Sequence, residues 1–191
     1  MNQQQFEQGL TFTDYLSRIE KNKQLHRQVY DEIQIPGEDV DFYRGLGPMN
    51  VMVIAEDWCP DVVHNLPIVA KVSDQAPNLT LRIFFRDANP ELMDQYLTNG
   101  NRAIPVVVFF DEKSNEVARW VRRPAKAQVW LDKEVLKGRK FQDVPKSELA
   151  GLDKKMAEKY RKEFRQETLM ELRQVLGRQS FISRSTQEAS S

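Results

Sequence analysis

The sequence is poor in the residues that build disulfides and metal centres. Among its 191 residues there are one cysteine, Cys59, and two histidines, His26 and His64. A single cysteine excludes an internal disulfide, and a zinc site of the usual Cys/His type would need almost all of these residues at suitable spacing. We therefore expect no metal site and no cofactor.

The sequence also lacks net charge and long apolar runs. Lysine plus arginine number 28, and so do aspartate plus glutamate, so binding of nucleic acid through bulk charge is not expected. No segment reaches the roughly 18 apolar residues of a membrane helix, and residues 1–8 are polar without the apolar stretch of a signal peptide. We expect a soluble, cytoplasmic protein with no membrane contact. Its oligomeric state is left open.

Enough apolar material remains for one core. Hydrophobic residues make up 40% of the sequence, which excludes a wholly disordered chain and favours one domain with an appendage. Apolar residues recur at helical spacing from Phe12 to Ile33, with Thr11 or Thr13 as a cap, before breaks at Pro36 and at residues 45–48. This pattern predicts an N-terminal helix.

The middle of the sequence alternates between strand and helix patterns. Four short segments have strand character, at residues 50–55, 79–85, 104–110 and 116–121. Helical patterns separate or follow them, at residues 60–75, 90–98 and 125–137. A strand–helix–strand start requires a parallel pair of strands, and the final hairpin adds antiparallel ones. We expect an α/β fold with a central mixed four-stranded sheet flanked by helices.

One apolar stripe at helical spacing runs through residues 146–176 and predicts a single long helix that packs on the body. Basic residues outnumber acidic ones from residue 125 onward, whereas the reverse holds before it. This segment therefore docks on an acidic body or on a partner, or presents a solvated helix surface. We divide the chain into an N-terminal helical segment (1–47), a core (48–135), and a helical extension with a flexible tail (136–191).

Two motifs carry a resemblance. Trp58-Cys59-Pro60-Asp61 stands between a buried strand and a helix, and Ile104-Pro105 opens the third strand. Together with the element order, they resemble the thioredoxin fold over roughly residues 48–135. In that family an Ile-Pro pair at this point has a cis proline beside the active-site cysteine, which implies the same for Pro105. The Trp-Cys-x-Asp segment is similar to a bacterial branch that has it in place of Trp-Cys-x-x-Cys.

The family's second cysteine is missing. Val62 stands at its position and no other cysteine replaces it, so dithiol turnover within one chain is excluded. Val53 likewise stands where thioredoxin has a buried carboxylate, and Glu56 and Asp57 in the approach turn are poor substitutes. The resemblance leaves Cys59 as a lone nucleophile that needs an external thiol to resolve its mixed disulfide.

The surroundings of Cys59 are predicted in part. A helix N-terminus favours the thiolate, whereas the charge of Asp61 opposes it, so the net pKa shift stays open. His64 falls about 140° round the helix from Cys59, which favours a packing or solvent role. Besides Cys59 we expect a substrate groove formed by Trp58, Pro60, Asp61, Ile104 and Pro105.

Four arginines fall near the predicted site. They follow strands or precede the Ile-Pro pair, at Arg86, Arg102, Arg122 and Arg123. Basic side chains near the site favour an anionic thiol, and guanidinium groups bind carboxylates bidentately, so we expect all four to be binding residues. Ordinary surface arginines are the alternative explanation.

Three functions remain open. The first is a monothiol thiol–disulfide oxidoreductase that uses Cys59 on a protein or low-molecular-weight thiol or disulfide substrate. The second is a redox-inactive protein-binding module that uses the groove between Trp58 and Pro105 or the C-terminal helix, with Cys59 as a packing residue. The third is iron–sulfur binding by a dimer, although Pro60-Asp61 differs from the Cys-Gly-Phe-Ser of monothiol glutaredoxins.

Overall fold

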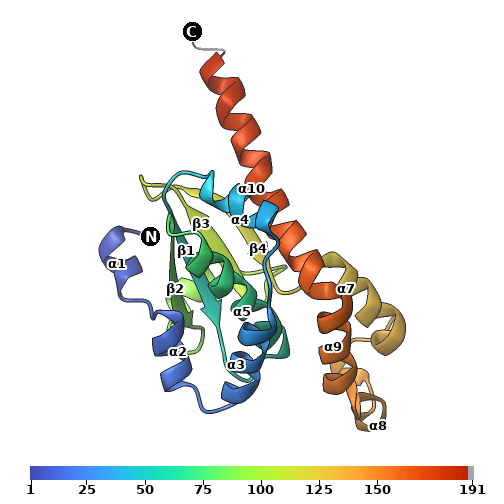
Figure 1. Ribbon diagram of the computed structural model, residues 1–191. Coiled ribbons are helices and arrows are strands. Elements are labelled where there is room, and N and C mark those ends of the chain that lie inside the picture. The colour runs from blue at the N-terminus through green and yellow to red at the C-terminus, as the bar shows by residue number, and fades with distance from the viewer. Residues whose placement is uncertain (189–191) are drawn as a thin grey trace.

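The computed structural model describes residues 1–188, with side chains described through residue 177. Its centre is one four-stranded sheet in the order β2-β1-β3-β4 (Figure 1). The strands are β1 (Met49–Ala55), β2 (Leu79–Phe85), β3 (Val106–Phe110) and β4 (Glu116–Val121). β1 pairs with β2 in parallel and with β3 antiparallel, and β3 pairs antiparallel with β4. The predicted mixed four-stranded sheet is confirmed.

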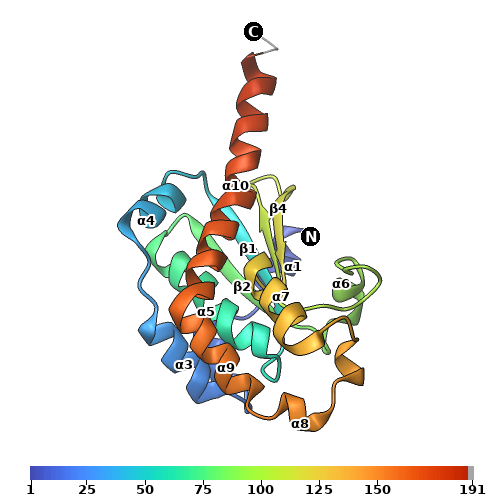
Figure 2. The same ribbon diagram turned by 90° about the vertical axis from the view of Figure 1, so that its right-hand side faces the viewer.

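Helix α5 (Pro60–Gln75) connects β1 to β2 and starts at the predicted site. The helices α3 (Lys23–Glu32), α4 (Gly37–Arg44) and α10 (Arg165–Glu188) pack against α5 on one face of the molecule (Figure 2). Within the described residues, no helix is both long and apolar enough to cross a membrane. Because these helices pack along α5, they hold the helix in place. Cys59, which lies at its N-terminus, is held in place with it.

The N-terminal segment differs from the single predicted helix. Thr11 caps the helix that starts at Phe12, as predicted, since its side chain accepts a hydrogen bond from the backbone N–H of Asp14. The chain then breaks at Asn22, which has a left-handed φ of 56°. Asp57 stabilises this break, because its carboxylate accepts the backbone N–H groups of Glu20 and Lys21. The result is α1 (Gln3–Glu7), α2 (Phe12–Arg18), α3 and α4.

The C-terminal segment is also divided more finely than predicted. Gly151 has a left-handed φ of 76°, which interrupts the expected helix. The helical elements after β4 are α7 (Ala125–Leu131), η1 (Asp132–Leu136), η2 (Phe141–Asp143), α8 (Lys146–Leu149), α9 (Leu152–Lys159), η3 (Tyr160–Phe164) and α10. α10 continues past Gly177, where the flexible tail was expected to begin, and residues 189–191 lie outside the described residues.

The predicted apolar stripe packs in two clusters, and only its C-terminal part joins the main core. Leu169, Leu172 and Leu176 of α10 belong to the main core. The basic charges of this segment meet acids of the N-terminal helices, because Arg173 pairs with Asp39 at 2.8 Å. Docking of the C-terminal extension on an acidic body is therefore an intramolecular contact.

A buried hydrogen-bond chain joins α5 to the extension. Asn65 of α5 donates to the Tyr160 hydroxyl at 2.9 Å and accepts from the Thr168 hydroxyl at 2.8 Å. Asn65, Tyr160 and Thr168 are fully buried. Because buried polar groups are costly without partners, this chain fixes how the extension sits beside the start of α5.

Replacing Thr168 with valine should destabilise the protein by about 1–3 kcal/mol, because the amide oxygen of Asn65 loses a buried donor. Urea unfolding measures this change. Thr13→Val, at an exposed position of α2, is the matched control and should change stability much less. Equal stability of the Thr168 variant and the wild-type protein would contradict the role of this chain.

Candidate functional site

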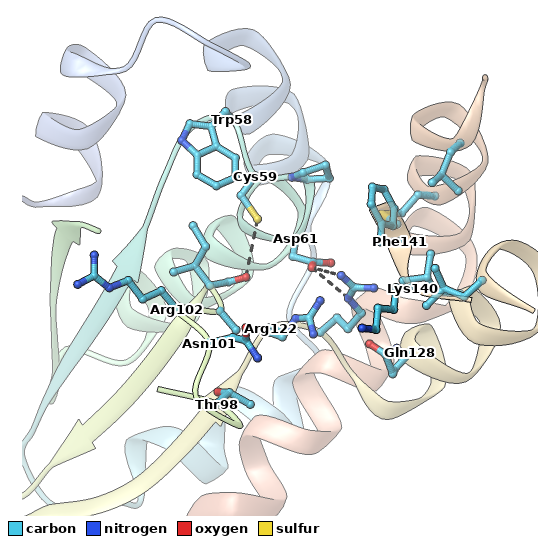
Figure 3. A pocket seen from close by; sticks show the side chains of 18 of the residues that line it. Trp58, Cys59, Asp61, Thr98, Asn101, Arg102, Arg122, Gln128, Lys140 and Phe141 are labelled. Carbon is cyan, nitrogen blue, oxygen red and sulfur yellow. Dashed lines mark hydrogen bonds and ion pairs between the residues drawn. The ribbon is translucent and has the colours of Figure 1, made fainter. Parts of the chain in front are cut away.

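Cys59 is the N-cap residue of α5 and is only 8% exposed. Its thiol donates to the carbonyl oxygen of Ile104 across an Sγ–O distance of 3.7 Å (Figure 3). The Ile104–Pro105 peptide bond that follows is cis, as the resemblance implied. The two motifs, which lie far apart in the sequence, therefore meet at one place.

A pocket of about 900 Å³ adjoins Cys59. All predicted site residues except Pro105, which is buried beside it, line this pocket: Trp58, Cys59, Pro60, Asp61, Arg86, Arg102, Ile104, Arg122 and Arg123. Its remaining wall comes from the C-terminal extension, including Lys140, Phe141, Leu152 and Met156. The core and the extension thus build the pocket together.

Asp61 and Arg123 form a buried ion pair at the pocket. Both Nε and Nη2 of Arg123 donate to Oδ2 of Asp61, at 3.0 and 2.5 Å. The two side chains are 10% and 6% exposed, for arginine and aspartate respectively. The other oxygen of Asp61, Oδ1, is buried and accepts no hydrogen bond from the described residues. Burial raises the pKa of Asp61, although the charge of Arg123 opposes that rise.

Two of the other arginines form ion pairs with aspartates other than Asp61. Arg86 pairs with Asp87 at 2.8 Å, and its guanidinium lies 4.7 Å from the centre of the Trp58 ring. Arg102 pairs with Asp94 at 2.7 Å and points away from Cys59 (Figure 3). Both arginines line the pocket, but each has an aspartate as its ion-pair partner.

The structure gives a direction to the protonation of Cys59. Burial raises the pKa of its thiol, and the nearby charge of Asp61 raises it further. Hydrogen bonds from the backbone of Val62 and Asp61, together with the charge of Arg123, act in the opposite direction. The effect of the helix N-terminus is present but is outweighed, because desolvation penalises the thiolate more.

The acidic approach turn has a structural role. Glu56 accepts a hydrogen bond from the backbone N–H of Asp87 at 2.8 Å. Asp57 accepts one from the backbone N–H of Glu20, between α2 and α3. The carboxylate that acts on the thiol is Asp61, whose charge opposes the thiolate as the sequence suggested. Within the described residues, no cluster of histidine, cysteine and acidic side chains could hold a metal ion.

Sequence analysis missed Tyr160, which lies behind the site. Its ring stacks on His64 with a centroid distance of 4.5 Å, so a packing role for His64 is confirmed. The analysis also missed Lys140, Phe141 and Met156 as pocket residues. Helical periodicity indicated that the extension packs on the body, but it carries no signal for which of its residues border the pocket.

Asp61→Asn should increase the alkylation rate of Cys59 near neutral pH by several-fold, because removing the carboxylate charge lowers the pKa of the thiol. Iodoacetamide labelling followed by mass spectrometry measures the rate. Asp94→Asn removes a comparable charge from an exposed ion pair and serves as control. An unchanged rate in a folded Asp61 variant would show that this charge does not act on Cys59.

The two histidines predict a pH dependence of stability. Burial lowers the pKa of His26 and of His64 from 6.5 to about 4. The unfolded chain therefore binds more protons between pH 4 and 6.5, so stability falls as the pH drops through this window. The loss is about 3 kcal/mol for each histidine.

A variant that combines His26→Phe and His64→Phe should lose this part of the pH dependence. Denaturant unfolding at pH 4 and at pH 6.5 measures the difference in stability for the variant and for the wild-type protein. Phenylalanine keeps the aromatic contacts of both rings with Tyr15 and Tyr160. The same pH dependence in the variant as in the wild-type protein would contradict the burial of neutral histidines.

Comparison with known proteins agrees with the observed fold. A family model described as thioredoxin matches residues 9–137. A protein of unknown function from Pseudomonas aeruginosa has a TM-score of 0.63 and 20% identity, covering 90% of this chain and 94% of its own. An HIV epitope-scaffold has a TM-score of 0.63 and 18% identity, covering 91% and 96%. No curated protein matches significantly. The structures show a shared fold alone, and the family match, which spans more than half of the sequence, shows that the chain belongs to the thioredoxin family.

Proposed function

We propose that this protein catalyses thiol–disulfide exchange with Cys59 as its only nucleophile and an external thiol as the resolving group. One observation carries the proposal: the Cys59 thiol lies 3.7 Å from the Ile104 carbonyl, next to a cis-proline, on a pocket of about 900 Å³. We assign the chain to a branch of the family in which the segment Trp58 to Asp61 replaces the two-cysteine motif.

The exchange takes place in two steps. The Cys59 thiolate attacks one sulfur of a disulfide, forms a mixed disulfide, and releases the other sulfur as a thiolate that takes up a proton. Because Val62 occupies the position of a second cysteine, an external thiolate must then attack the mixed disulfide and release Cys59. The substrates are protein or low-molecular-weight thiols and disulfides, and the reducing cytoplasm supplies the resolving thiol.

The protonation of Cys59 determines the speed of the first step. Since burial and Asp61 raise the pKa of the thiol, most of the protein holds a neutral Cys59 at neutral pH, and the rate rises with pH. The thiolate that does form is a strong nucleophile, because nucleophilicity increases with the pKa of the thiol. We therefore propose that the protein exchanges disulfides slowly at neutral pH, because only a small fraction of its Cys59 is thiolate.

A redox-inactive binding module is the second candidate, and the burial of Cys59 favours it. Trp58 and Phe141 are 41% and 54% exposed and lie on opposite sides of the pocket (Figure 3). Exposed aromatic side chains of this kind are common anchors at protein interfaces. In this case Cys59 fills space between the two motifs and does not react.

The test is the reaction of the purified protein with 2-hydroxyethyl disulfide, followed as the mass of the Cys59 adduct. We expect an adduct whose rate of formation rises about tenfold per pH unit below the pKa of Cys59, and none in Cys59→Ser. Added 2-mercaptoethanol should remove the adduct. No adduct in a folded protein at any pH up to about 9 would reject exchange and favour the binding module.

A further inference from the structure

The pocket beside Cys59 has an excess of positive charge. Five basic side chains line it: Arg86, Arg102, Arg122, Arg123 and Lys140. Three of these have carboxylate partners, which are Asp87, Asp94 and Asp61. Within the described residues, Arg122 and Lys140 have no ion-pair partner. The only other acidic side chain on the lining is Asp153, which is exposed on α9.

Arg122 is held in place by its backbone. Its φ of 69° lies in the left-handed region, which is uncommon for a residue other than glycine. Its N–H donates to the carbonyl oxygen of Pro105 at 2.7 Å, and its own carbonyl accepts from Asn65 at 3.3 Å. Backbone strain of this kind persists where the surroundings enforce it, often at functional sites. Arg122 is thus fixed between the cis-proline and α5, close to Cys59.

Lys140 belongs to the opposite wall. It is exposed on the extension, and Figure 3 shows its side chain reaching across the pocket toward the side on which Arg122 lies. The elements after β4 also line the pocket with apolar side chains, which are those of Leu131, Leu136, Phe141, Leu152 and Met156. The wall therefore offers a cation together with apolar surface, which suits a ligand that carries both an anionic group and methylene groups.

The size of the pocket favours a small ligand. A volume of about 900 Å³ falls in the range of small-molecule sites, roughly 300–1,000 Å³. Arg122, Lys140 and Cys59 all line this one volume, so a compact molecule bound in it lies among both cations and the thiol. Guanidinium binds a carboxylate in a planar, two-point geometry.

We propose that the external thiol is a low-molecular-weight thiol with a carboxylate, which binds Arg122 and Lys140 while its sulfur joins Cys59. This inference rests on the proposed function. Cys59 attacks the ligand sulfur in its disulfide with a target, so the ligand–target bond breaks, a Cys59–ligand disulfide forms, and the target leaves as a thiol. A second ligand thiolate then attacks the ligand sulfur and releases Cys59. In the net reaction one ligand thiol and the ligand–target disulfide become the target thiol and a disulfide of two ligands, so one disulfide bond replaces another and no other oxidant or reductant is needed.

The experiment compares two disulfides, the anionic 3,3′-dithiodipropionate and the neutral 2-hydroxyethyl disulfide. The rate at which each forms a Cys59 adduct is measured by mass spectrometry, and the ratio of anionic to neutral rates is taken for each variant. Leaving-group chemistry is the same in every variant, so a change in the ratio reports the pocket alone. We expect Arg122→Gln and Lys140→Gln each to lower the ratio by about three- to tenfold.

Two further variants serve as controls. Arg27→Gln removes the same charge from an exposed position of α3 outside the pocket and should leave the ratio unchanged. Asp153→Asn removes the opposing charge from the lining and should raise the ratio. Higher salt should reduce the ratio of the wild-type protein, because screening weakens exposed ion pairs. Because Lys140 is exposed, its variant keeps the test valid if the Arg122 variant fails to fold.

The outcomes separate the two proposals. A ratio that stays the same in both the Arg122 and the Lys140 variants would overturn the anionic ligand while leaving exchange at Cys59 intact. An acidic peptide disulfide that reacts much faster than 3,3′-dithiodipropionate, in a manner that depends on Arg122, would overturn the small ligand in favour of a protein. No adduct with either disulfide rejects the proposed function itself, because the neutral reagent needs no cation.

Discussion

The buried ion pair between Asp61 and Arg123 is the interaction on which the site depends. It joins the first turn of α5 to the segment between β4 and α7, and both side chains are almost fully buried. A buried charge without its partner is strongly unfavourable, so the two segments have to stay together for the fold to be stable. Cys59, the N-cap of α5, lies two residues before Asp61, and Arg122 directly precedes Arg123, so the same contact brings the Cys59 thiol and the Arg122 side chain to one pocket.

This pair also gives the site its electrostatic character. The family resemblance implies a buried carboxylate on the strand before the motif, where this chain has Val53. The buried carboxylate beside the thiol is instead Asp61, on the helix after the motif. Burial raises the pKa of Cys59, the charge of Asp61 raises it further, and the charge of Arg123 acts in the opposite direction. The surroundings of the single cysteine thus disfavour its thiolate.

Much of the fold could be predicted from the sequence. The strands are short apolar runs, and the Trp58–Asp61 and Ile104–Pro105 motifs each lie at a strand end, so local patterns were sufficient. The breaks within the helical segments were not predictable in this way. The break at Asn22 depends on hydrogen bonds that Asp57, which is distant in sequence, accepts from backbone N–H groups. The break before α9 depends on the left-handed conformation of Gly151.

The site was predictable to a similar degree. The family motifs identify Cys59 and its immediate neighbours, but they carry no information on the pairing of Arg123 with Asp61. They also do not show that the extension completes the pocket through Phe141 and Met156. Periodicity indicates which face of a helix is apolar, whereas the partner of that face is decided by tertiary packing. The protonation of Cys59 is a consequence of that packing.

The most direct test of this account is the pKa of Cys59, measured from the ultraviolet absorbance of the thiolate as the pH is raised. Cys59→Ser provides the blank that removes the contribution of the tyrosines, and the presence of one cysteine makes the signal unambiguous. We predict a pKa above the ordinary value of about 8.5, because burial and Asp61 both disfavour the thiolate. A pKa below about 7 would contradict the account, since it would mean that the helix N-terminus and Arg123 outweigh them.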